Sequence, residues 1–146
     1  MSRVIGLDYG KKRTGVAVTD ALQLIATPLK TVESYRIIAF LKDYIAAESV
    51  ETIVVGWPLQ LDGNEGPATR LVAQFMRLLK RHFAEIPVVH YDERFTSVIA
   101  QKSLLASGLK KKKRQEKARL DARSASLILD SFLENKRWKA RQVALG

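Results

Sequence analysis

The sequence predicts an α/β fold in which a mixed five-stranded sheet, made of a three-stranded antiparallel meander and two parallel strands, is flanked by helices. The first observation behind this prediction is a pair of apolar runs near the N-terminus, within Arg3–Tyr9 and Thr14–Thr19. A short, glycine-containing connection separates them, which predicts an antiparallel hairpin. A third strand over Gln23–Val32 contains Pro28, which cannot donate to a ladder, so we expect this strand at a sheet edge.

The second observation is the alternation of helical and strand patterns that follows. Apolar residues recur every three or four positions over Ser34–Glu48 and over Thr69–Phe83, which indicates two amphipathic helices, the first with Ser34 as its N-cap. A compact apolar strand follows each helix, at Glu51–Gly56 and at Ile86–Tyr91. A helix between two strands makes a crossover, so we expect Glu51–Gly56 to run parallel to the first strand.

The C-terminal third is predicted to hold two further helices separated by a cationic loop. Helical periodicity covers Thr96–Ser107 and Leu120–Arg137. Five consecutive cations lie between them, from Lys110 to Arg114. Because like charges repel one another, we expect a mobile loop over residues 108–119.

Length and composition favour one ordinary globular domain. A chain of 146 residues can bury a core, and its 47% hydrophobic and 27% charged residues are typical of globular proteins. We expect the domain to span residues 1–138, followed by a basic tail at 139–146 that frays. The lack of cysteine excludes a disulfide framework, a thiolate zinc site and a cysteine nucleophile. No secretion signal follows Met1, and no apolar run approaches the roughly 18 residues that span a bilayer, so we expect a cytoplasmic protein.

The positive charge of the chain is concentrated at its C-terminal end. The net charge is +10, and residues 1–100 hold 12 Lys and Arg against 11 Asp and Glu, while residues 101–146 hold 13 against 4. Such a block indicates a polyanionic partner, most commonly nucleic acid, although it also suits a solubilising tail. The residues that we expect to contact nucleic acid are Lys11, Lys12, Arg13, Lys110, Lys111, Lys112, Lys113 and Arg114.

An acidic residue at the end of the first strand is the most informative single position. Asp8 follows an apolar run of the kind that a sheet covers on both faces. A buried carboxylate without compensation costs several kcal/mol, so it requires a cation, a metal ion or hydrogen-bond donors. The alternative is a structural role, in which Asp8 caps the turn at Gly10 through its own side chain.

Further carboxylates occur where they could reach the same place. Asp92 and Glu93 follow the last predicted strand, and Asp121 lies on or beside the apolar stripe of the last helix. Asp121 also suits a helix N-cap, worth about 1 kcal/mol without any catalytic role. If the three elements bring their acids together, the repulsion favours Mg²⁺ or Mn²⁺, which prefer hard oxygen ligands. One or two such ions can activate water and stabilise the leaving oxygen of a phosphodiester.

Other catalytic patterns are weaker. His82 and His90 lack the spacing of an HExxH metal site, and we expect them to be surface and strand residues. Trp57 suits a lid or stacking residue, but packing in the core or in a loop explains it better. No GxxxxGK[ST] phosphate loop occurs.

Four motifs occur in order along the chain: GLDYGKKRTGVAVTD, VVGWPLQLDGNEGP, YDERFTS and LDARSASLIL. Together they resemble the motifs of the YqgF family, which is RuvC-like and Holliday-junction-resolvase-like and is also described as "putative pre-16S rRNA nucleases". The resemblance covers residues 3–137. It implies an RNase H-like fold and a metal-dependent endonuclease site at Asp8, Glu93 and Asp121. The choice of Glu93 over Asp92 rests on the motif alone.

The resemblance also implies a substrate and leaves alternatives open. It implies maturation of the 5′ end of 16S rRNA in the bacterial cytoplasm, in contact with ribosomal particles. The rivals are cleavage of four-way DNA junctions, where dimerisation would matter, and a non-catalytic RNA-binding role in ribosome assembly. The chain itself is expected to be a monomer or a homodimer. One departure from the RuvC pattern is that an acid follows the fourth strand there, whereas Gly56-Trp57-Pro58 ends it here.

Overall fold

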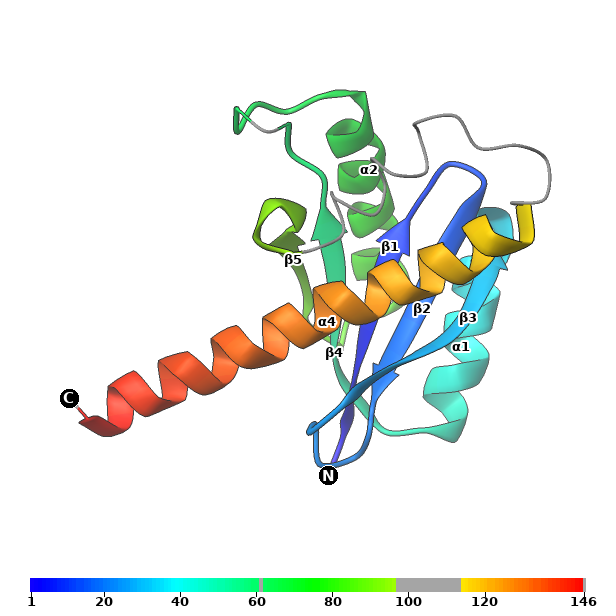
Figure 1. Cartoon of the computed structure of the whole chain (residues 1–146). Coiled ribbons are helices and arrows are strands. Elements are labelled where there is room, and N and C mark those ends of the chain that lie inside the picture. Colours follow the sequence, from blue (N-terminus) through cyan, green and yellow to red (C-terminus); the bar gives the residue numbers. More distant parts are fainter. Residues whose placement is uncertain (61, 97–113, 146) are drawn as a thin grey trace.

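The computed structural model describes residues 1–60, 62–96 and 114–145. Figure 1 shows the elements that these residues form in chain order. They are β1 (Arg3–Tyr9), β2 (Arg13–Thr19), β3 (Ala26–Glu33), α1 (Ile37–Ala47), β4 (Val50–Trp57), α2 (Pro67–His82), β5 (Val88–Asp92) and α4 (Arg114–Leu145), with 3₁₀ turns at Ser34–Arg36 and Glu93–Phe95.

The described residues form a five-stranded sheet in the order β3-β2-β1-β4-β5. β1 pairs antiparallel with β2, and β2 pairs antiparallel with β3. β4 runs parallel to β1, and β5 runs parallel to β4. The predicted meander and the two parallel strands are therefore confirmed. Pro28 lies on β3 at the edge of the sheet, as its missing donor predicted.

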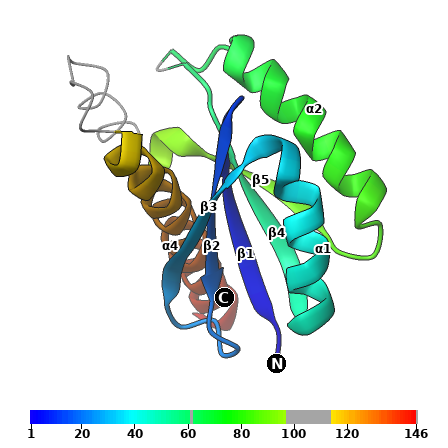
Figure 2. The same ribbon diagram turned by 90° about the vertical axis from the view of Figure 1, so that its right-hand side faces the viewer.

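Helices cover both faces of this sheet (Figure 2). α1 and α2 lie on one face, where Ile5, Leu7 and Val55 of the strands are buried together with Leu41 and Leu79 of the helices. α4 crosses the other face, and its own cluster joins strand residues to helix residues: Val4, Ala17 and Val54 with Ala125, Ile128 and Leu129. Side chains alternate between the faces along each strand, so each strand contributes to both cores.

The start of the first helix differs from the prediction. Ser34 does not cap α1; the chain first makes a 3₁₀ turn at Ser34–Arg36, and α1 begins at Ile37. The Ser34 hydroxyl instead donates to the carbonyl of Gly10 and bonds the hydroxyl of Thr14 at 2.9 Å. Because Ser34 is buried beside the β1–β2 turn, long-range partners satisfy it in place of the helix terminus.

α4 is longer at both ends than predicted. It begins at Arg114, so residues 114–119 of the expected loop are helical, and it continues to Leu145, so the expected tail is helical as well. The flanking segments consist largely of Ala, Arg, Lys, Gln and Leu, which favour the helix strongly, with no Gly or Pro before residue 146. The predicted helix at 96–107 falls almost entirely on residues 97–113, outside the described residues, as do Lys110 to Lys113.

Within the described ranges, we find no helix that combines the length and the apolar character needed to cross a lipid bilayer.

Candidate active site

Asp8 is buried at the end of β1, with 5% of its surface exposed. It alternates with Val4 and Gly6, which face α4, so its side chain lies on the α4 side of the sheet. Its partner across the β1–β2 ladder is Gly15. On the other side β1 pairs with β4 up to Leu7 and Val55, and the residues that follow this pair are Asp8 and Gly56. Asp8 is thus flanked by a glycine on each neighbouring strand.

Gly15 allows α4 to approach the sheet at Asp121. A Cβ atom on Gly15 would lie only 1.8 Å from the backbone oxygen of Asp121 and 2.7 Å from the backbone nitrogen of Ala122. The helix backbone therefore rests directly on β2 at this point, which no other residue type permits without displacing the helix. This contact fixes Asp121 beside the residue that pairs with Asp8.

Gly56 likewise leaves space for Glu93 to lie close to the sheet. A Cβ atom on Gly56 would lie 2.9 Å from the carboxylate oxygen Oε1 of Glu93 and 2.6 Å from the Ile128 side chain. Glu93 begins the 3₁₀ turn after β5 and is 4% exposed. Its carboxylate therefore lies over β4, next to the strand position that carries Asp8. Gly56, at the strand end where no acid follows, leaves room for this carboxylate.

Asp92 has a different environment. Its carboxylate accepts hydrogen bonds from the Arg94 backbone N–H at 2.9 Å and from the Arg94 guanidinium, whose Nη2 lies 2.7 Å away. The hydrogen bonds from the Arg94 side chain hold the pKa of Asp92 below its ordinary value, against the opposing effect of burial. Nη1 of Arg94 also lies 3.2 Å from where a Cβ of Gly63 would be, so the Asp92–Arg94 pair packs against the loop between β4 and α2.

Asp121 lies within α4, seven residues after the helix begins, and is therefore not its N-cap. Its Oδ2 lies 3.5 Å from Nε of Arg13, and both side chains are largely covered, with exposures of 20% and 29%. In this structure Arg13 pairs with this acid, and its predicted contact with nucleic acid stays a prediction. The neighbouring Lys11 and Lys12 are exposed at the tip of the β1–β2 turn, which a 2.9 Å bond from Gly10 N–H to the Arg13 carbonyl closes.

The three predicted acids lie on the same side of the sheet, but their side chains do not close on a single point. Within residues 1–60, 62–96 and 114–145, no three acidic or histidine side chains are grouped tightly enough to hold one metal ion as they stand. The donor chemistry nevertheless fits Mg²⁺ or Mn²⁺, because Asp8 and Glu93 are carboxylates with about 5% exposure or less and Asp121 is adjacent. Asp121 would have to leave Arg13 to join them.

Two features of the site escaped the sequence analysis. The first is the role of Gly15 and Gly56, although a glycine inside a strand is itself a signal of close backbone approach. The second is the pairing of Asp92 with Arg94, which spacing alone could not distinguish from a ligand role. The side chains of residues 114–120 are not described, so the prediction for Arg114 stays a prediction.

Comparison with known proteins decides the family. The family model described as "RuvX: Holliday junction resolvase" matches residues 2–135. The chain belongs to the RuvX family. RuvX relatives named "Putative pre-16S rRNA nuclease" include one from Bacteroides thetaiotaomicron, 48% identical over 94% of this chain and 100% of its own, and one from Phocaeicola vulgatus, 49% identical over 94% of this chain and 99% of its own.

The solved structures confirm the RNase H-like fold. Thermus thermophilus RuvC in complex with a Holliday junction substrate superimposes with a TM-score of 0.58 at 20% identity, covering 94% of this chain and 96% of that one. A second structure of Thermus thermophilus RuvC gives a TM-score of 0.52 at 19% identity, over 92% and 96% of the two chains. Membership of RuvX identifies the protein as a nuclease, a hydrolase of phosphodiester bonds, that binds nucleic acid.

Proposed function

We propose that this protein is a metal-dependent endonuclease that processes the 5′ end of pre-16S rRNA in the cytoplasm, with Asp8, Glu93 and Asp121 as its metal ligands. The observation that carries the proposal is a pair of buried carboxylates on the α4 face of the sheet: Asp8 at the end of β1, and Glu93 just after β5, with its carboxylate against Gly56 of the intervening β4. Asp121 of α4 is fixed beside them at Gly15. A divalent cation would balance the negative charge that these acids gather at one end of the sheet. The names of the relatives favour the rRNA substrate.

In this mechanism each residue has a separate task. When bound, a divalent cation would supply water activation and charge stabilisation at the scissile phosphate. Asp8 and Glu93 would hold the cation from the sheet, and Asp121 would complete the ligand set from α4. Arg13 pairs with Asp121 and would compete with the cation for it. Lys11 and Lys12, exposed at the same end of β1, bind backbone phosphates of the substrate.

The family description favours a second candidate substrate, the four-way DNA junction. Junction cleavage requires two symmetric cuts and therefore a dimer, whereas a single cut at an rRNA end does not. The substrate that is cut and the oligomeric state of the protein therefore both distinguish a junction resolvase from an rRNA nuclease.

The experiment compares wild type with Asp8→Asn and Glu93→Gln on a 5′-extended 16S rRNA precursor and on a four-way DNA junction, in Mg²⁺, Mn²⁺ or EDTA. Asp43→Asn is the matched control, because it removes the same charge from an exposed position on α1, across the sheet. We expect the wild type and the control to cut the RNA only with metal, and the site variants to bind it uncut. Junction cleavage alone would favour the resolvase, and no cleavage by any protein would favour a binding role.

Melting temperatures give a readout that does not depend on cleavage. At a metal concentration ten times the dissociation constant, binding stabilises the folded state by about 1.4 kcal/mol, which raises the melting temperature by about 3–6 °C. We expect this rise in wild type and Asp43→Asn and its loss in Asp8→Asn. An equal rise in Asp8→Asn would place the metal elsewhere.

A further inference from the structure

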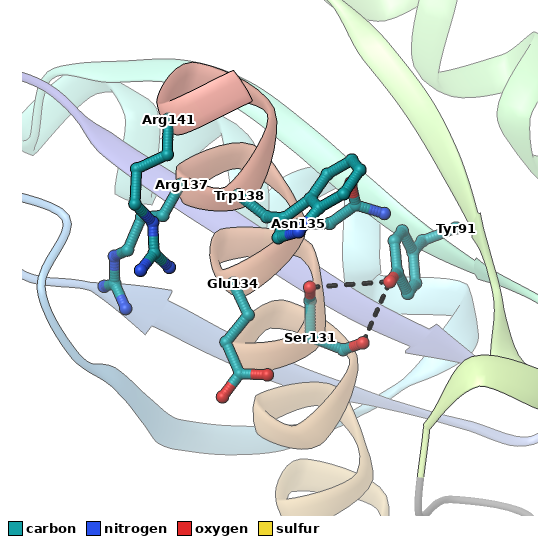
Figure 3. A pocket seen from close by; sticks show the side chains of 7 residues that line it. All are labelled: Tyr91, Ser131, Glu134, Asn135, Arg137, Trp138 and Arg141. Carbon is teal, nitrogen blue, oxygen red and sulfur yellow. Dashed lines mark hydrogen bonds between the residues drawn. The ribbon is translucent and has the colours of Figure 1, made fainter. Parts of the chain in front are cut away.

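A groove of about 660 Å³ lies where the last turns of α4 pass β5. Tyr91 of β5 forms one wall, and residues of α4 form the other, among them Ser131, Glu134, Arg137, Trp138 and Arg141 (Figure 3). The α4 residues recur at three- and four-residue intervals, so they share one face of the helix. The groove is therefore built from an extended, regular helix and not from a loop.

The two aromatic residues of the groove differ in how far they are buried and held in place. Tyr91 is held in place, because Ser131 Oγ donates to its hydroxyl at 2.9 Å and Phe132 packs edge-on against its ring. Trp138 is 57% exposed, although an indole ring is costly to leave in water. The other tryptophan, Trp57, is half-buried against the ring of His90. Trp138 therefore presents a large aromatic face to whatever enters the groove.

The groove also carries positive charge. Arg137 and Arg141 line it together with one acid, Glu134, and Lys136 and Lys139 lie on the same segment of α4. Arg137 is anchored, since its Nη2 donates to the carbonyl oxygens of Gln23 at 3.2 Å and Leu24 at 2.8 Å. In Figure 3 the two arginine side chains lie to one side of Trp138, and Tyr91 lies to the other.

An exposed aromatic face beside two arginines, one of them anchored, fits one class of ligand well. Single-stranded nucleic acid offers unpaired bases that stack on aromatic rings and phosphates that bind arginine. In a duplex the bases are already stacked on each other and cannot reach the indole ring. An acidic peptide would satisfy the arginines but would leave the aromatic face unused.

One end of the groove is close to the candidate active site. Tyr91 precedes Glu93 by two residues at the end of β5, which corresponds to a separation of about 7 Å along an extended chain. Trp138 lies further along α4, ten residues after Ile128, which contacts Gly56; this corresponds to about 15 Å of helix. Both the groove and the site lie on the face of the sheet that α4 covers. Trp138 and Arg141 lie beyond residue 135, where the match to the RuvX family model ends.

We propose that this groove binds a single-stranded stretch of nucleic acid that extends away from the bond that is cut, with a base stacked on Trp138 and phosphates bound by Arg137 and Arg141. The proposal rests on the proposed nuclease function, because it concerns the substrate of that same site. The groove selects substrates in which an unpaired segment flanks the cleavage point.

The test measures binding by full-length protein in EDTA, so that cleavage does not enter. The probes are fluorescein-labelled 12-nucleotide oligo(U) and oligo(dT), and a hairpin duplex, followed by fluorescence anisotropy. We expect Trp138→Ala to weaken binding of both single strands about tenfold and to leave duplex binding within twofold, with Trp138→Phe restoring most of the loss. Arg141→Gln should lower the salt slope of single-strand binding by about 0.7. Val143→Ala is the matched control, on the same exposed segment of α4 but outside the groove.

The outcomes separate this proposal from the nuclease proposal. The groove proposal is wrong if Trp138→Ala and Arg141→Gln bind the single strands as tightly as wild type does. It is also wrong if Trp138→Ala lowers the affinity for the duplex as much as the affinity for the single strands. A protein that cuts nothing but loses single-strand affinity through Trp138→Ala would support the groove and reject the nuclease. Far-UV circular dichroism and melting curves check that each variant is folded, which the exposure of Trp138 favours.

Discussion

Replacing Gly15 by alanine tests whether the contact between α4 and β2 positions Asp121. The new Cβ atom would lie 1.8 Å from the backbone oxygen of Asp121, whereas ordinary contact begins near 3.4 Å, so the two backbones would have to separate by about 1.6 Å. Neither partner is a flexible side-chain end that could move aside. We therefore expect a destabilisation of about 3 kcal/mol, at the upper end of the range for overpacked cores. The melting temperature should fall by about 6–12 °C.

The same displacement should reduce catalysis beyond its effect on folding. A shift of about 1 Å in a catalytic group can cost about 100-fold in rate, so we expect at least this loss in cleavage at a temperature where the variant is fully folded. Gly6→Ala is the graded comparison, because its Cβ would meet Leu129 at 2.9 Å and the Ala125 carbonyl at 3.0 Å, a milder conflict on the same helix. Denaturation followed by circular dichroism and single-turnover cleavage measure the two effects. If Gly15→Ala melted and cleaved like Gly6→Ala, the reasoning would be refuted.

Three further predictions concern charged residues. The Arg13→Gln variant should bind Mn²⁺ several-fold more tightly than wild type in titration calorimetry, because the ion no longer competes with Arg13 for Asp121. The free energy of unfolding should change by less than about 1 kcal/mol. Weaker Mn²⁺ binding by the variant would show that Arg13 and the metal ion do not compete. Asp92→Asn should lower the melting temperature at pH 6, and the difference from wild type should vanish on acidification. Arg94 depresses the pKa of Asp92 in the folded state, so the stabilisation by the ionised carboxylate is complete above the unfolded pKa of about 3.9 and is lost as the pH falls through the lower folded pKa. Melting curves from pH 6 to pH 2 measure this loss. Replacing Lys110 to Lys113 by alanine should weaken RNA binding and lower its salt slope by about 3, and an unaltered slope would exclude these lysines from the interface.

Local sequence rules predicted the sheet well because its constraints are local. Pro28 lacks a backbone N–H donor, which predicts an edge strand whatever the order of the other strands, and β3 is an edge strand of the sheet. The apolar run at Glu51–Gly56 after a helix predicted a parallel strand, which β4 is. Each of these inferences used only the chemistry of residues adjacent in the chain.

The inferences that failed depended on distant partners. Ser34 has the composition of an N-cap, yet its hydroxyl bonds Gly10 and Thr14 across the β1–β2 turn. The choice of Glu93 over Asp92 rested on the motif; the bonds between Asp92 and Arg94, two residues apart, were not foreseen, because spacing cannot separate a paired acid from a ligand. The site residues stay a prediction, and the pairing of Asp121 with Arg13 could not be foreseen, because Arg13 lies 108 positions earlier in the chain.

The direct contact of Gly15 with Asp121 joins residues 106 positions apart, so the candidate site is assembled from the first hairpin and the last helix. Closing so long a loop is entropically expensive and slow, and it cannot occur before the C-terminal helix has been synthesised. A nascent chain that has made the whole sheet but lacks α4 has Asp8 and Glu93 uncovered and no third acid. On the proposed site, hydrolytic activity would therefore arise only when translation of the chain is nearly complete, and a truncation before α4 would remove it.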